Sequence, residues 1–226
     1  MKDTSYQPTD RRPVASRQLT SVGRFAAWLV SRGISANSIS LASTVFSMLA
    51  CLSLMGTTWG DGALPRVLFF CGAVFIQARL LANLFDGMVA LDSGTSSPLG
   101  EVLNEVPDRV SDPLILIGAG FAVGGWPSLG FIAAILAVFV AYVRVLGNSL
   151  GERDLFLGPM AKPQRMATLT VACIYSGCVP ASWPGGIESA PGFGATTFAL
   201  VLVVVGSVVT AVRRLRRISV QLRRRG

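Results

Sequence analysis

The sequence predicts an all-α membrane protein, a six-transmembrane-helix bundle preceded by an N-terminal interfacial helix. Three observations lead to this prediction. The 226-residue chain is 51% hydrophobic and only 14% charged, whereas soluble domains carry about 25% charged residues. Apolar segments long enough to cross a bilayer recur along the chain. Basic residues gather on one side of these segments, as expected for a polytopic protein.

The apolar segments define the expected helices. A spanning helix needs about 20 mostly apolar residues, and six segments meet this need, at roughly 38–58, 65–91, 99–124, 127–150, 164–184 and 194–213. Ahead of the first span, Phe25, Ala26, Leu29 and Val30 recur at helical spacing until Gly33. Such an amphipathic segment predicts a helix that lies on the lipid headgroups.

Lysine and arginine predict the topology. With the N-terminus inside, the cytoplasmic side holds nearly all basic residues and the opposite side holds only Arg66. This asymmetry predicts that both termini are cytoplasmic. It also accounts for most of the net charge of +8, so nucleic-acid binding is not indicated. The basic run at 213–225 is either a stop signal for the last span or a contact with anionic lipid.

The chain divides into three parts by composition. Residues 1–20 are polar and predict a disordered cytoplasmic tail. Residues 21–215 form one membrane domain, and 216–226 form a basic cytoplasmic tail.

Six of the twelve acidic residues lie between positions 83 and 112. The expected topology places this stretch at the cytoplasmic membrane face, as two helices joined by the turn DSGTSSP. Each helix carries a polar stripe at helical spacing. The stripes consist of Arg79, Asn83, Asp86 and Ala90 on the first helix and Glu101, Asn104, Glu105, Asp108 and Asp112 on the second. Because an acid that faces lipid is costly, both stripes should point into the bundle, toward each other.

Clustered carboxylates and carboxamides require a cation between them. A hard divalent ion such as Mg²⁺ or Mn²⁺ takes oxygen ligands, while the absence of histidine and of paired cysteines argues against zinc. Internal ion pairing with Arg79, Arg109 and Arg144 is the alternative.

The acidic stretch resembles the signature of the CDP-alcohol phosphotransferase (CDP-alcohol phosphatidyltransferase) family, whose members are six-span enzymes. That signature reads D-x-x-D-G-x-x-A-R, then eight residues, then G-x-x-x-D-x-x-x-D. The present chain reads NLFDGMVAL at 83–91, then eight residues, then GEVLNEVPD at 100–108. The spacing matches throughout. Asn83 and Asn104 replace acids, however, and Leu91 replaces the arginine.

The resemblance implies roles for the matching residues. In the family, the signature acids hold one or two divalent ions against the pyrophosphate of a CDP-linked substrate, and the last acid takes the proton from the attacking alcohol. By this resemblance Asp86 is a metal ligand, and Asp108 is the catalytic base that also contacts the metal. Asn83 and Asn104 become neutral oxygen ligands. Two further acids, Glu105 and Asp112, are placed to compensate for the two missing carboxylates.

The same resemblance predicts contacts with substrate. At Gly87 a side chain would block the approach of the nucleotide to the helix backbone, although close helix packing also explains a glycine there. Arg144 in AYVRVLG and Lys162 and Arg165 in GPMAKPQRM resemble the family's basic positions for substrate phosphate. The expected substrate-binding set is therefore Gly87, Ala90, Gly100, Arg144, Lys162 and Arg165.

The resemblance implies an enzyme of the cell inner membrane that moves a substituted phosphate from a CDP-linked donor, such as CDP-diacylglycerol, to an alcohol acceptor. The reaction releases CMP and belongs to phospholipid biosynthesis. Expected partners are the CDP-linked lipid, the acceptor and membrane lipids, and a homodimer is compatible with the resemblance. The two asparagines and Leu91 leave open a non-catalytic relative that binds nucleotide or lipid. A small transporter that uses the acids as an ion path is a third reading.

Overall fold

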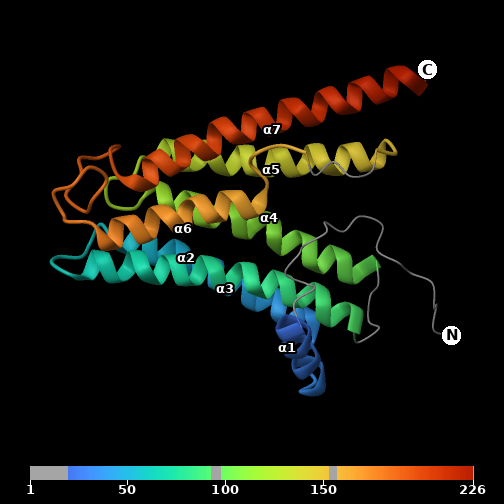
Figure 1. Cartoon of the computed structure of the whole chain (residues 1–226), viewed down its shortest axis with the longest axis horizontal. Coiled ribbons are helices and arrows are strands. Elements are labelled where there is room, and N and C mark those ends of the chain that lie inside the picture. Colours follow the sequence, from blue (N-terminus) through green and yellow to red (C-terminus); the bar gives the residue numbers. More distant parts are fainter. Residues whose placement is uncertain (1–19, 93–97, 153–156, 226) are drawn as a thin grey trace.

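The computed structural model describes residues 20–92, 98–152 and 157–225, and at positions 20–21, 91–92, 98–101, 103, 104 and 225 it describes the backbone alone. Within these ranges the chain is all-helical (Figure 1). Its helices are α1 (Thr20–Ser31), α2 (Ala36–Gly56), α3 (Leu64–Asp92), α4 (Pro98–Gly120), α5 (Pro127–Ser149), α6 (Lys162–Cys178) and α7 (Ala195–Arg225). The prediction of an all-α protein is confirmed. The expected tail at 1–20 lies almost wholly outside the described residues.

Four of the described helices, α2, α3, α5 and α7, are long and apolar enough to cross a membrane. The chain is therefore a multi-pass membrane protein. α4 and α6 coincide with the predicted third and fifth spans, but α4 carries several charged side chains and α6 has only 17 residues. The figure of six spans stays a prediction.

The long helices form a bundle with α1 at one end (Figure 1). α2 packs on α3 and α4, and α5 packs on α4 and α7. α6 packs on both α3 and α7. One apolar core runs between them and includes Phe69, Ile76, Leu116, Leu169 and Leu200. Large apolar side chains also cover the outside of the bundle, as a lipid-facing surface requires.

α1 and α2 meet at a defined corner. Gly33 has a φ of 70°, which suits glycine, and the Ser35 hydroxyl then accepts a hydrogen bond from the Ser38 N–H at 3.1 Å, capping α2. α1 packs on α3 through Phe25 and Phe85, whose ring centroids are 4.8 Å apart. α1 is thus attached to the part of α3 that carries Asp86.

α4 is tightly held against α2 but has an unusual backbone. A Cβ added at Gly118 would lie 2.7 Å from the Cα of Cys51, so the two helices touch backbone to backbone there. Nearer its start, α4 continues through two internal prolines, Pro107 and Pro113. Each proline removes one backbone N–H from the helical ladder, and the prolines immediately flank the segment from Asp108 to Asp112.

Candidate functional site

Asp108 and Asp112 of α4 face Arg79 of α3 inside the bundle, and α6 brings Lys162 and Arg165 to the same two acids. Asp108 of α4 accepts a hydrogen bond from Arg79 Nη2 at 3.0 Å. Its carboxylate also contacts the Asn83 amide of α3 and the Lys162 ammonium of α6. Three helices that are distant in sequence therefore converge on one carboxylate.

Asp112, one turn further along α4, makes the deeper half of this network. Its carboxylate lies 2.8 Å from Arg79 Nη2 and 2.7 Å from Arg165 Nη2. Both guanidinium groups are buried, and the Asp112 side chain is only 7% exposed. We refer to Arg79, Asp108, Asp112, Lys162 and Arg165 as the charge cluster. Two acids and three bases give it a formal charge of +1.

Asp86 lies beside the charge cluster but is held from the other direction, by α2. Its side chain is buried, and the Ser40 hydroxyl donates to Asp86 Oδ2 at 2.9 Å. One turn on, the Ser43 hydroxyl donates to Asn83 Oδ1 at 2.5 Å. Asn83, about one turn before Asp86 on α3, contacts Asp108. α2 thus sets the orientation of both polar side chains that α3 contributes.

Glu105 and Arg144 form a separate pair at the edge of the site. Glu105 bonds to Arg109, one turn along α4, and to Arg144 Nη2 of α5 at 2.9 Å. The Glu105 side chain is 45% exposed, in contrast to Asp112. The acid proposed to compensate for missing carboxylates therefore contacts arginines in this structure.

The remaining predicted residues are only partly described. Gly87 and Ala90 lie on α3 within about one turn of Asp86, and Gly87 is buried. Gly100 and Asn104 belong to α4, but the Asn104 side chain lies outside what the structure describes.

Side-chain chemistry tests whether a divalent cation fits. Among the described residues, no three His, Cys, Asp or Glu side chains gather closely enough to hold a metal ion. Asp86 Oδ1, however, is buried and has no hydrogen-bond partner in the described part of the chain. A buried carboxylate oxygen without a partner is costly, and a cation relieves that cost. Asn83 and Asp108 supply further oxygens, which suit a hard ion. The residues therefore fit one hard cation on the Asp86 side of the cluster.

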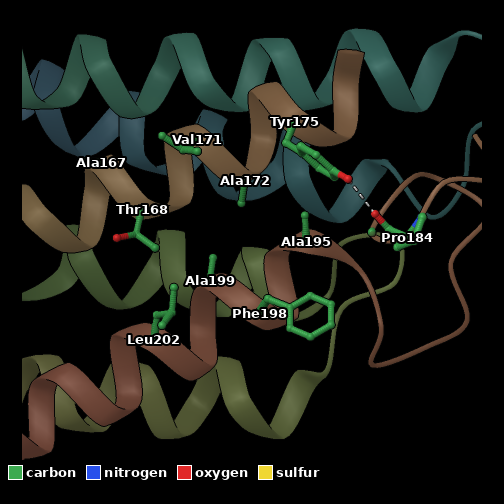
Figure 2. A pocket seen from close by; sticks show the side chains of 11 residues that line it. Ala167, Thr168, Val171, Ala172, Tyr175, Pro184, Ala195, Phe198, Ala199 and Leu202 are labelled. Atoms are coloured by element: carbon green, nitrogen blue, oxygen red, sulfur yellow. Dashed lines mark hydrogen bonds between the residues drawn. The ribbon is translucent and has the colours of Figure 1, made fainter. Parts of the chain in front are cut away.

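An apolar hollow of about 570 Å³ lies elsewhere, between α6 and α7 (Figure 2). Its lining includes Val171, Tyr175, Phe198 and Leu202 and contains no charged side chain. The Tyr175 hydroxyl donates to the Pro184 carbonyl at 2.9 Å, at one end of the hollow. It offers nothing for phosphate chemistry, so the charged site between α3, α4 and α6 remains the candidate.

Sequence comparison places the chain among known enzymes, although no family model matches it. A phosphatidylinositol phosphate synthase of Streptomyces avermitilis is 28% identical over 197 residues, which cover 84% of this chain and 74% of that protein. An archaetidylinositol phosphate synthase of Aeropyrum pernix is 32% identical over 146 residues, which cover 59% of this chain and 74% of that protein. The chain belongs to the CDP-alcohol phosphatidyltransferase family. It is a transferase of substituted phosphate groups with a CDP-linked donor.

Solved structures share the fold of this CDP-alcohol phosphatidyltransferase. Phosphatidylinositol phosphate synthase of Mycobacterium tuberculosis in complex with manganese and citrate superposes with a TM-score of 0.68 at 21% identity, covering 87% of this chain and 88% of that one. The same enzyme with CDP-DAG bound gives a TM-score of 0.67 and covers 92% of that chain. At 21% identity, the superposition shows that the two proteins share a fold.

Two features of this CDP-alcohol phosphatidyltransferase escaped the sequence interpretation. The hydroxyls of Ser40 and Ser43 orient Asp86 and Asn83. Their signal was present, since Ser40, Ser43 and Ser47 form a polar stripe at helical spacing within an apolar span. The second feature is the position of Arg79 between Asp108 and Asp112. The sequence indicated that Arg79 could form an ion pair inside the bundle, but it did not identify the two acids.

Proposed function

We propose that this family member transfers a phosphatidyl group from CDP-diacylglycerol to an alcohol, with release of CMP. The observation that supports this most is the convergence of Asp86, Asn83 and Asp108 with the bases Lys162 and Arg165. These are the residues that the family signature and its phosphate-binding positions select. They meet between α3, α4 and α6 although more than 50 positions separate Asp108 from Lys162.

Asp108 is the proposed base for the attacking hydroxyl. Its side chain is 17% exposed, against 7% for Asp112, and Asp86 is buried. Asp108 is thus the acid of this group that an alcohol reaches most easily. Hydrogen bonds from Arg79 and Asn83 fix the Asp108 carboxylate. As the alcohol oxygen attacks phosphorus, the proton of the alcohol moves to a carboxylate oxygen of Asp108.

The bases Lys162 and Arg165 have the second role. They stand at the start of α6, where Arg165 is fixed through Asp112 and through the Met160 carbonyl at 3.2 Å. Positive charge at this position attracts the substrate phosphates and orients them in line with the hydroxyl. Arg144, paired with Glu105 at the edge of the site, extends the same basic surface toward α5.

The proposed cofactor is a divalent cation, Mg²⁺ or Mn²⁺, held by Asp86 with Asn83 and Asp108. The α4 residues Asn104, Glu105 and Asp112 are the further oxygens predicted from the sequence. In this structure Glu105 pairs with Arg109 and Arg144, and Asp112 pairs with Arg79 and Arg165. When bound, such an ion neutralises charge on the pyrophosphate and on departing CMP. Gly87, Ala90 and Gly100 are the proposed contacts with the nucleotide.

The proposed setting is the cell inner membrane. α4 and α6 join the four apolar helices as spans, α1 lies on the headgroups, and both termini are cytoplasmic. The distribution of basic residues supports this orientation. α7 runs to Arg225, so most of the basic segment 216–226 continues the helix. Residues 21–215 form the catalytic membrane domain, and a homodimer is part of the proposal.

A non-catalytic relative is the second candidate, and one observation favours it. Two cations, Arg79 and Lys162, already pair with Asp108, the acid that must accept the proton. A protein in which this pairing persists would bind a CDP-linked lipid without turnover.

The assay for both candidates is CMP release by the purified protein in detergent, with CDP-diacylglycerol, Mn²⁺ and a panel of alcohols with and without phosphate groups. We expect CMP release with at least one acceptor, and a loss of about 10²- to 10⁴-fold in Asp108→Asn, the usual contribution of a general base. Asp61→Asn changes an exposed acid in the turn before α3 and should leave the rate unchanged. Silence across the panel, with CDP-diacylglycerol still bound, would establish the non-catalytic candidate instead.

A further inference from the structure

Arg79 is a fully buried cation in a helix that is apolar enough to cross the membrane. Its side chain is 0% exposed, and it is the largest of the fully buried side chains in the described part of the protein. A charge in this position is expensive unless it is paired. Arg79 Nη2 lies 3.0 Å from Asp108 and 2.8 Å from Asp112, so one guanidinium group serves two acids.

This arrangement changes the charge that a metal ion would meet. A site with acids at all four signature positions carries a charge of −4. Here Asn83 and Asn104 leave only Asp86 and Asp108, a charge of −2. Asp86 together with the charge cluster of +1 sums to 0, and Arg79 supplies one of the three positive charges. Within the charge cluster, the acids Asp108 and Asp112 are already balanced by bases. Asp86 differs, because its described hydrogen bond comes from the neutral hydroxyl of Ser40.

We infer that Arg79 is a built-in counter-cation that occupies the α4 side of the metal site and restricts it to one weakly held divalent ion on the Asp86 side. The inference rests on the metal site of the proposed function. It gives the two neutral asparagines and the buried arginine a common effect, since each makes the site less negative than acids at all four signature positions would.

Arg79 is a fixed part of the site. The side chain is fully buried and is held through Nη2 by Asp108 and Asp112, while its buried Nε and Nη1 have no hydrogen-bond partner among the described residues. Moving the side chain away would leave Asp112 facing Arg165 alone. A metal ion therefore binds beside Arg79 rather than in its place.

The test is Mn²⁺ affinity without substrate, measured from the electron paramagnetic resonance signal of free Mn²⁺ over the protein in detergent. Arg79→Gln removes the charge and keeps a polar side chain of similar length. Removing a full positive charge from beside a doubly charged ion weakens their repulsion, so the variant should bind Mn²⁺ at least about tenfold more tightly than the wild type, a change of about 1.4 kcal/mol.

Two controls separate charge from structure. Arg79→Lys keeps the charge and should retain the weak affinity of the wild type. Arg214→Gln removes another buried arginine, one that donates to the Leu157 and Val140 carbonyls, and should leave Mn²⁺ affinity unchanged.

A second variant keeps the inference testable if Arg79→Gln does not fold. The double variant Arg79→Gln with Asp112→Asn removes one charge of each sign, so the cluster keeps its net charge. It should bind Mn²⁺ at least about tenfold more tightly than Asp112→Asn alone.

Affinity in Arg79→Gln equal to or weaker than that of the wild type, or no gain in the double variant over Asp112→Asn, would overturn the inference. Because these titrations contain no CDP-linked lipid, they are independent of CMP release. Tighter Mn²⁺ binding together with an absence of turnover would uphold the role of Arg79 and reject the proposed activity.

Discussion

Ser40 offers a direct test of how α2 orients the site. Its hydroxyl donates to Asp86 Oδ2 at 2.9 Å, and both residues are buried. Because Asp86 Oδ1 has no hydrogen-bond partner among the described residues, Ser40→Ala leaves the carboxylate without a described side-chain donor. A hydrogen bond to a charged group contributes about 1.5–3 kcal/mol. For a protein of this size the loss corresponds to a melting temperature about 3–12 °C lower.

If catalysis requires Asp86 in one orientation, the loss of the Ser40 hydrogen bond should also lower activity. A loss of 1.5–3 kcal/mol in transition-state stabilisation, the same estimate for one charged hydrogen bond, is about a 10- to 150-fold fall in kcat/KM for CMP release. Thermal unfolding in detergent and CMP release from CDP-diacylglycerol measure the two effects. Ser40→Thr keeps the hydroxyl and should restore most of both.

Ser47 provides a matched control on the same face of α2. Its side chain is also buried, but its hydroxyl donates to the Ser43 carbonyl of its own helix at 2.9 Å. Ser47→Ala should therefore change stability by less than about 0.5 kcal/mol, since alanine is the better helix former. Equal behaviour of Ser40→Ala and Ser47→Ala would refute the argument that the Ser40 hydroxyl orients Asp86.

Three further outcomes are expected. Gly118→Ala should destabilise the protein by about 1–3 kcal/mol in thermal unfolding, because the new Cβ meets the Cys51 backbone at 2.7 Å; Gly23→Ala, with nothing within 4 Å of its Cβ, should not. Asp112→Ala should cost about 3–5 kcal/mol and suppress CMP release, since it leaves the buried Arg165 without its acid and the buried Arg79 with Asp108 alone. Glu105 is more exposed, so Glu105→Ala should cost less than about 1 kcal/mol in stability and still lower activity. EDTA should abolish CMP release and Mn²⁺ should restore it; full activity in EDTA would contradict a divalent cofactor.

Much of the fold could be predicted from the sequence, because the thickness of the bilayer sets a minimum length for each apolar helix that crosses it. The six apolar segments coincide with α2 to α7 within a few residues at most ends. The largest difference is at the end of α7, which continues past residue 213 to Arg225. The length of an apolar segment shows only how much of a helix can contact lipid. A helix can continue through arginines without any change in its backbone hydrogen bonds, so the sequence did not show where α7 ends.

The site was accessible in part, through spacing. Helical periodicity put Asn83 and Asp86 on one face of α3 and Asp108 and Asp112 on one face of α4, and the structure turns these faces toward each other. The assignment of metal ligands stays a prediction. Sequence did not determine the individual partners, because they depend on contacts across helices. Ser40 reaches Asp86 across 46 positions, and Arg165 reaches Asp112 across 53.

The two prolines within α4 have a consequence for how this helix can move. Pro107 and Pro113 remove backbone hydrogen bonds on either side of the turn that carries Asp108 and Asp112. A helix with these gaps bends more easily than a regular one. The acidic turn can therefore tilt while the far end of α4 stays locked against Cys51 at Gly118. One helix thus combines an acid-bearing end that lacks two backbone hydrogen bonds with an end that touches α2 backbone to backbone.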